Sequence, residues 1–138
     1  MRAITHIVIH CTATPQTATV ASIQRYWREN LKWRSPGYHR IILANGNVVT
    51  LQPDNLPTNG VAGHNANSIH ISYIGGVDKS GKPVDNRTAA QIASMIALIN
   101  EYRAKYPNAV VCGHRDFAGV KKACPSFDVK SWLASLAK

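Results

Sequence analysis

The chain has 138 residues, a length typical of a single domain with one hydrophobic core. No apolar run approaches the roughly 20 residues of a membrane-spanning helix, so we expect no insertion into a membrane. The 16 Lys and Arg residues against 7 Asp and Glu residues give a net charge of +9, which favours a polyanionic partner such as nucleic acid, anionic lipid or an anionic cell-wall polymer. The basic residues are spread along the chain without a recognisable nucleic-acid-binding motif, so we do not expect nucleic acid to be that partner.

The first half of the chain predicts strands around one helix. Residues 4–10 are rich in Ile and Val and predict a strand. Thr19 can cap a helix whose apolar positions recur every three or four residues, at Val20, Ile23, Trp27 and Leu31. The pair Asn45-Gly46 is a strong hairpin signal, so strands near 38–43 and 48–51 should pair antiparallel.

The middle of the chain predicts a long loop, a strand and a helix. Residues 52–68 are rich in Asn, Gly and Pro, and a loop of this length is more often functional than idle. Residues 68–74 alternate apolar and polar side chains, which predicts a strand with Ile69, Ile71 and Tyr73 on one face. Thr88 and Gln91 form a capping box for a helix that ends near Tyr106. The expected buried stripe of that helix comprises Ile92, Met95, Ile96, Ile99, Tyr102 and Arg103.

The last third predicts a short buried strand at 109–112, a loop at 113–127 and a final helix capped by Asp128. Strands and helices therefore interleave, and at least one strand pair is antiparallel. This order predicts an α/β fold with a mixed sheet covered by helices, in one domain over residues 1–138.

Three cysteines, an odd number, argue against a disulfide framework. Cys11 and Cys112 lie in apolar surroundings, which predicts that both are buried as small hydrophobic side chains. Cys124 instead follows Lys121 and Lys122 in a polar loop, and these positive charges should lower the pKa of its thiol.

Two histidines at strand ends and this cysteine form a candidate metal site. His10 ends the first predicted strand, His114 follows the last one, and Cys124 lies ten residues further on. The carboxyl ends of strands in an α/β sheet often meet at one edge, where such folds place their sites. Two imidazoles and a thiolate suit zinc, and three protein ligands leave a fourth position for water, as in catalytic sites. Because the chain has six histidines, the alternative is three unrelated residues.

Tyr38 and Lys122 are candidate partners of that metal. Attack of a zinc-held water on an amide creates an oxyanion, and a phenol and an ammonium group are suitable donors to it. Lys122 lies two residues before Cys124, so both side chains can point to the same side of an extended segment. Taken singly, Tyr38 is better explained as an aromatic residue at a strand edge, and Lys122 as an exposed charge beside Lys121.

Five sequence segments occur in an order that resembles a known family. They are Ile7–Thr14, Gly37–Ile42, Gly63–Ile69, Gly113–Asp116 and Lys122–Asp128. Together they resemble the zinc-dependent type-2 N-acetylmuramoyl-L-alanine amidases, which include amidase-type phage lysozymes and animal peptidoglycan recognition proteins. The resemblance covers nearly the whole chain and is closest to the phage lysozymes, although the segment from His114 to Cys124 is longer here.

The resemblance implies a fold, a reaction and a set of roles. The fold is a central mixed β-sheet of about five strands flanked by helices. The reaction is zinc-dependent hydrolysis of the amide bond between N-acetylmuramic acid and L-alanine in bacterial peptidoglycan. The resemblance assigns the Zn²⁺ ligands to His10, His114 and Cys124, the catalytic pair to Tyr38 and Lys122, and substrate binding to His64 and Asn67.

Two other functions remain open from the sequence. One is a peptidoglycan-binding module without hydrolysis, which is how family members lacking a zinc ligand behave; the presence of Cys124 favours the enzyme. The other is a basic nucleic-acid or protein-binding domain. We expect a monomer that is made in the cytoplasm, because the N-terminus lacks signal-peptide features, and that acts on the cell wall after release.

Overall fold

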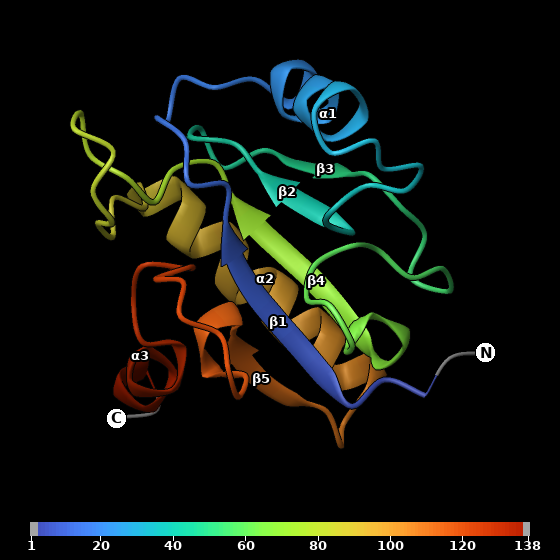
Figure 1. The fold of residues 1–138 in the computed structure, drawn as a ribbon. Helices are drawn as coiled ribbons and strands as arrows, with labels where there is room; N and C mark the ends of the chain where they lie inside the picture. The colour runs from blue at the N-terminus through green and yellow to red at the C-terminus, as the bar shows by residue number, and fades with distance from the viewer. Residues whose placement is uncertain (1–2, 137–138) are drawn as a thin grey trace.

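A five-stranded mixed sheet forms the centre of the molecule in the computed structural model, which describes residues 3–136 (Figure 1). The strand order is β3-β2-β4-β1-β5. Strands β4, β1 and β5 are parallel, β2 is parallel to β4, and β3 is antiparallel to β2. The strands span β1 His6–Cys11, β2 Arg40–Ile42, β3 Val48–Thr50, β4 Ser68–Tyr73 and β5 Val110–Gly113. The α/β fold with a mixed sheet and the predicted hairpin are confirmed.

Strand β1 lies inside the sheet, between β4 and β5, and is buried on both faces. Because successive side chains of a strand point to opposite faces, Ile7 and Ile9 enter the main core. Val8 belongs to a separate cluster on the other face, and His10 shares the parity of Val8. The same alternation on β4 places the predicted apolar set in the main core, which leaves His70 on the face of His10.

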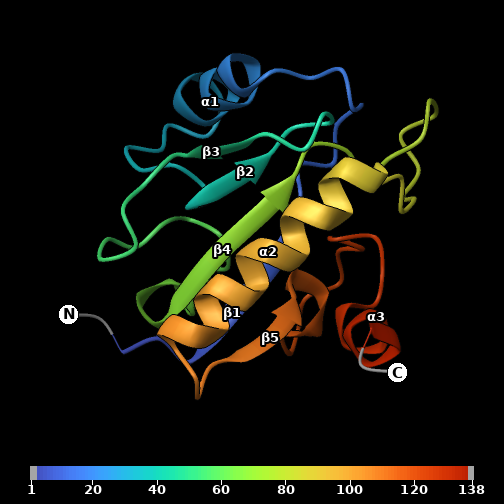
Figure 2. The same cartoon turned by 180° about the vertical axis from the view of Figure 1, so that it is seen from behind.

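Helix α2 (Ala89–Lys105) covers one face of the sheet, crossing behind β1 and β4 in Figure 1 and in front of them in Figure 2. The predicted capping box is present: the Thr88 hydroxyl accepts from the Gln91 amide N–H, and the Gln91 side chain accepts from the Thr88 N–H. The buried face of the helix comprises Gln91, Met95, Leu98, Ile99 and Tyr102. It differs from the predicted stripe, because Ile92 and Ile96 are half-buried and Arg103 is exposed.

Helix α1 (Val20–Glu29) packs on the opposite face, over β2. Its buried residues Ile23 and Trp27 contact Ile41, whose neighbour Ile42 points into the main core instead. The Thr19 cap is confirmed, and Trp27 is a core residue. The prediction that Leu31 belongs to this helix was wrong, because the helix ends two residues earlier and leaves Leu31 38% exposed.

Helix α3 (Val129–Leu136) lies beside β5 at the edge of the sheet (Figure 2). Val129 is fully buried in the main core, and Asp128 caps the helix by accepting from the Ser131 N–H at 3.1 Å. Two short 3₁₀ helices, η1 (Asn65–Asn67) and η2 (His114–Asp116), flank β4 and β5. Across residues 3–136, no helix has both the length and the apolar character of a membrane span.

The buried side chain of Gln91 connects the start of α2 to two strands. Its amide nitrogen donates to the carbonyl oxygens of Ile42 and Ile74, at 3.2 and 3.0 Å, just where β2 and β4 end. We predict that Gln91→Leu lowers the free energy of unfolding by about 1–3 kcal/mol, because both carbonyls stay buried without this donor. Urea denaturation measures the change. The same substitution at the half-buried Gln24 of α1 is the control, and equal stability of the two variants would contradict this role.

Candidate metal centre and active-site cleft

His10 is fixed near the carboxyl end of the interior strand β1. It is 1% exposed, and its ring lies 4.8 Å from the ring of His114, centroid to centroid. Its Nδ1 is 3.8 Å from the sulfur of Cys124. The imidazole therefore projects from a rigid, fully paired strand toward the two other predicted ligands.

His114 comes to the same edge because β5 runs parallel to β1. The residue directly follows β5 and begins η2, whose turn is closed by the Asp116 carboxylate accepting from the Gly113 N–H at 2.7 Å. The donor atoms of His10, His114 and Cys124 all lie within 4.8 Å of one another. The sequence predicted this convergence from the strand ends, and the three residues do meet.

Cys124 reaches the site through a loop that the sheet holds in place. Its sulfur accepts from the backbone N–H of Cys11 at 3.2 Å, and its carbonyl accepts from the N–H of Arg115 at 2.9 Å. Gly113 is needed for this approach, because a Cβ there would lie 2.8 Å from the ring of Pro125. The longer segment between His114 and Cys124 thus still returns the thiol to the strand ends.

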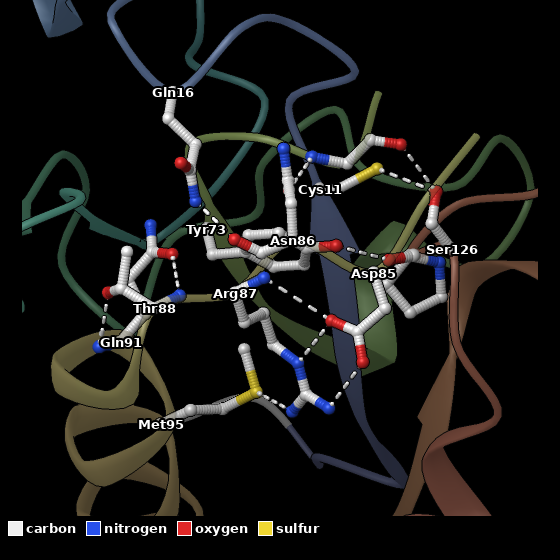
Figure 3. Close-up of polar contacts among 12 residues, drawn as sticks. Cys11, Gln16, Tyr73, Asp85, Asn86, Arg87, Thr88, Gln91, Met95 and Ser126 are labelled. Atoms are coloured by element: carbon white, nitrogen blue, oxygen red, sulfur yellow. Dashed lines mark hydrogen bonds and ion pairs between the residues drawn. The ribbon is translucent and has the colours of Figure 1, made fainter. Parts of the chain in front are cut away.

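The residues after Cys124 anchor the loop to the main core. The hydroxyl of Tyr73 donates to the Pro125 carbonyl at 2.7 Å, and Ser126 donates to the Gly76 carbonyl at 2.8 Å. Figure 3 shows Ser126 also facing the Cys11 sulfur, at 3.8 Å. Because these contacts come from the segment at and beyond the end of β4, the cysteine depends on the same sheet that positions His10.

A buried cation secures the start of α3. The guanidinium of Arg87 stacks 3.5 Å from the ring centre of Phe127 and 4.4 Å from that of Trp132, and its Nε pairs with Asp85 at 2.9 Å (Figure 3). Arg87 also contacts the sulfur of Met95 on α2 at 3.7 Å. Stacking on two aromatic rings with a carboxylate partner compensates for the burial of this charge. Through Phe127, the cluster restrains the chain three residues beyond the thiol.

Burial keeps both histidines of the cluster neutral. Desolvation lowers the pKa of His10 well below its ordinary value, and the nearby His70, His114 and Lys122 lower it further. Desolvation and Lys122 also lower the pKa of His114. A neutral imidazole is the form that binds a metal, so the environment favours the ligand state near neutral pH.

The two thiols behave differently from the sequence-based expectation. Cys11 is buried as predicted, but it also hydrogen-bonds with Cys124, which lowers the pKa of Cys11 to about 7. That hydrogen bond and burial raise the pKa of Cys124 and outweigh the opposite effect of Lys122. Lys122 does lower the pKa of Cys124, as predicted, but the net shift is upward, because the contact with Cys11 and the burial of the thiol could not be seen in the sequence.

Tyr38 lies beside His10 in the cleft. Its hydroxyl donates to the carbonyl of Cys11 at 3.2 Å, and its ring is 5.1 Å from the ring of His10 and 5.4 Å from that of Trp27. Burial, reinforced by the Cys124 charge, raises the pKa of the phenol far above its usual value. Tyr38 is consequently a neutral O–H donor held next to the cluster.

A cavity of about 190 Å³ contains the three candidate ligands, Tyr38 and Lys122. Two larger clefts of about 640 and 660 Å³ adjoin it, and all three spaces share Trp33 and Lys122. The lining of one cleft includes Asn59, Asn65 and Lys121, whereas the other is lined mainly by α1 and its neighbouring loops. The cluster therefore lies within an extended groove that has two arms.

The two predicted substrate-binding residues lie apart from the cluster. His64 is exposed and stacks on Phe117, with ring centres 4.5 Å apart. Asn67 donates to the Ala3 carbonyl at 2.8 Å, at the amino end of β1, away from His10. Neither residue lines the clefts described above, whereas Asn65, which lies between them, does.

Sequence reasoning missed His70, which contacts His10 directly. The His10 Nε2 and the His70 Nδ1 are 2.8 Å apart, and His70 is fully buried. The available signal was its polar position in the alternating pattern of β4. Only the parallel pairing of β1 with β4, which the sequence does not specify, places both histidines on one face.

Comparison with known proteins agrees with this geometry. The family described as N-acetylmuramoyl-L-alanine amidase matches residues 1–127. The endolysin of Klebsiella phage KP32 is 37% identical over 127 residues, covering 91% of this chain and 83% of the relative, and the endolysin of Escherichia phage T7 is 38% identical with the same coverage. The solved structure of the N-acetylmuramoyl-L-alanine amidase LysC from Clostridium intestinale superimposes with a TM-score of 0.81 at 25% identity, covering 99% of this chain and 87% of that one. The chain belongs to the N-acetylmuramoyl-L-alanine amidase family.

Proposed function

We propose that the chain is a zinc-dependent amidase that cleaves the bond between N-acetylmuramic acid and L-alanine in peptidoglycan. Family membership and the endolysin and amidase relatives support amide hydrolysis in peptidoglycan. The observation that carries the finer proposal is the convergence of two imidazole nitrogens and one sulfur in a groove beside Tyr38 and Lys122.

The donor set of the cluster fits zinc. His10, His114 and Cys124 would hold the ion with two neutral nitrogens and one sulfur, a combination found at catalytic zinc sites. Bound zinc supplies a Lewis acid that polarises a carbonyl group and acidifies water. Because the three residues line a cavity in the groove, a substrate carbonyl would have access to an ion that they held.

Ligation requires the thiolate of Cys124. The Cys11 N–H points at the sulfur, and the charge of Lys122 favours the anion, so the chain supplies two stabilising partners for it. In the opposite direction, the Cys124 thiol donates a hydrogen bond to the Cys11 side chain, which raises the pKa of Cys124. We therefore assign the backbone N–H of Cys11, and not its thiol, to support of the ligand.

Tyr38 is proposed to donate its O–H to the oxyanion that develops on the scissile carbonyl. Its raised pKa keeps the proton on the phenol, which suits a donor and disfavours a role as the base. Trp27 packs against the ring and fixes its position, so the single O–H only has to turn from the Cys11 carbonyl to the oxyanion when charge develops.

Lys122 is proposed to act as the second donor and to attract the substrate. The positive charge of Lys122 acts to lower the pKa of His10, His114 and Cys124. Its side chain also lines all three spaces of the groove. With the net charge of +9, it favours association with an anionic wall polymer. The extended groove suits a glycopeptide that reaches past the cleaved bond on both sides.

The roles of His64 and Asn67 in substrate binding rest on the resemblance alone. Their neighbour Asn65 lines the groove, so this segment borders the proposed substrate path. We further propose that one domain acts as a monomer, because a single sheet supports the whole cluster. The endolysin names of the relatives support action on the wall after release from the cell.

Removal of the proposed thiolate ligand tests the metal site. We predict that the purified chain binds about one zinc ion and that Cys124→Ala binds it far more weakly, because one of three ligands is lost. Zinc content after dialysis, measured by atomic spectroscopy, gives the answer. Cys112→Ala is the matched control, since Cys112 is buried on β5 outside the cluster. Equal zinc content in both variants would contradict the assignment of Cys124.

Removal of the metal tests the reaction. We predict that a chelator abolishes release of stem peptides from purified peptidoglycan and that added zinc restores it, because the Lewis acid is essential. Activity that survives complete zinc removal would contradict the mechanism. A chain that binds zinc and peptidoglycan but releases no peptide would instead be a binding module.

Tyr38→Phe separates catalysis from metal binding. We predict a loss of turnover on the order of 100-fold or more with unchanged zinc content, since an oxyanion donor is removed and no ligand is touched. Peptide release under saturating substrate measures turnover. Tyr106→Phe, at the end of α2, is the control. Loss of zinc in Tyr38→Phe would show that the phenol supports the metal site.

A further inference from the structure

A second buried histidine lies behind the proposed metal ligand. Nδ1 of His10 faces the Cys124 sulfur, and its Nε2, across the ring, is 2.8 Å from Nδ1 of His70. One hydrogen occupies this contact, so one nitrogen donates and the other accepts. The choice matters, because a hydrogen on Nδ1 of His10 would occupy the lone pair that points to the metal position.

Asn65 decides which nitrogen donates. Its Oδ1 lies 2.8 Å from the backbone N–H of Val61, and a partner that can only donate identifies this atom as the amide oxygen. The same oxygen is 2.9 Å from Nε2 of His70. Nε2 of His70 therefore carries a hydrogen, and in the neutral ring Nδ1 is left as the acceptor. His10 must then donate from Nε2, which leaves its Nδ1 free for the metal.

The packing around His70 maintains this arrangement. A Cβ at residue 60 would lie 2.3 Å from Nδ1 of His70, so Gly60 provides the space that the ring occupies. Gly60 is not among the positive-φ glycines, so space explains the residue better than backbone conformation does. On its other side, the ring of His39 stacks on His70, with centroids 6.1 Å apart and planes at 15°.

We propose that Asn65 and His70 form a positioning relay that holds His10 as the Nε2–H tautomer and thereby sets the affinity of the chain for zinc. The proposal rests on the zinc site proposed above. His70 acts through His10 and touches neither substrate nor metal, so it is a positioning residue. Partners of this kind, which orient a metal-ligating histidine through its other nitrogen, commonly contribute 10–100-fold to metal affinity.

Zinc affinity of two nearly isosteric variants tests the relay. His70→Leu removes the acceptor, and we expect it to weaken zinc binding by roughly 10–100-fold. His70→Asn places an amide oxygen close to the former Nδ1 position and should bind zinc more tightly than His70→Leu. Gly60→Ala, which removes no polar group, should also weaken binding by displacing the ring. Competition with a chromophoric chelator measures each dissociation constant, and equal affinity of His70→Leu and the unmodified chain would overturn the proposal.

The tautomers themselves can be read in the unmodified chain. Two-bond ¹⁵N–¹H spectra of the zinc-free protein at mildly alkaline pH distinguish Nδ1–H from Nε2–H imidazoles. We expect the Nε2–H form for both His10 and His70, and an Nδ1–H form of His70 would overturn the relay even if a variant failed to fold. Absence of zinc binding by the unmodified chain would instead overturn the metal site, and the spectra would still test the relay separately.

Discussion

The parallel pairing of β1 with its two neighbours is the constraint on which the site depends. It brings the carboxyl ends of β1 and β5 to one edge of the sheet, and His10 and His114, which lie at these ends, meet there. Because side chains alternate along β1, Ile7 and Ile9 pack into the core against α2, whereas His10 points to the opposite face and into the groove. A shift of register by one residue would exchange these faces. The register of β1 therefore determines both the packing of the core and the position of His10, the candidate metal ligand.

The third candidate ligand depends on the core more indirectly. Cys124 belongs to a loop, and loops take their position from what they touch. Here the contacts are the Cys11 N–H, the Tyr73 hydroxyl at Pro125, and the stack of Arg87 on Phe127. Each partner is buried and part of the sheet or its flanking segments. The thiol is therefore held almost as firmly as the strand residues, which a metal site with a fixed geometry requires.

The sequence predicted the candidate ligand cluster because His10 and His114 lie at the ends of strands, and strand ends are where α/β folds commonly place their sites. It could not predict the environment of the thiol. Cys11 precedes Cys124 by more than a hundred residues, and only the folded loop brings them together and reverses the expected pKa shift of Cys124. The predicted end of the first helix was wrong for a similar reason: Leu31 continues the apolar spacing, but the helix ends at Glu29. Apolar spacing indicates that a segment can form a helix, whereas tertiary contacts determine the residue at which that helix ends.

His70 illustrates how a buried polar residue can belong to a site without reaching the groove. In a half-exposed strand, the polar positions of β4 would face water, but the segments around Gly60 and Asn65 cover this face. Burial of an imidazole costs free energy unless both of its nitrogens are hydrogen-bonded. Here a series of hydrogen bonds runs from the Val61 N–H through Asn65 and His70 to His10, and it pairs both nitrogens of His70. The same hydrogen bonds also fix which group donates at each contact of this network, because the backbone N–H of Val61 at one end can only donate. One network thus satisfies the buried polar groups and, in the relay proposed above, also leaves Nδ1 of His10 free as a candidate metal ligand.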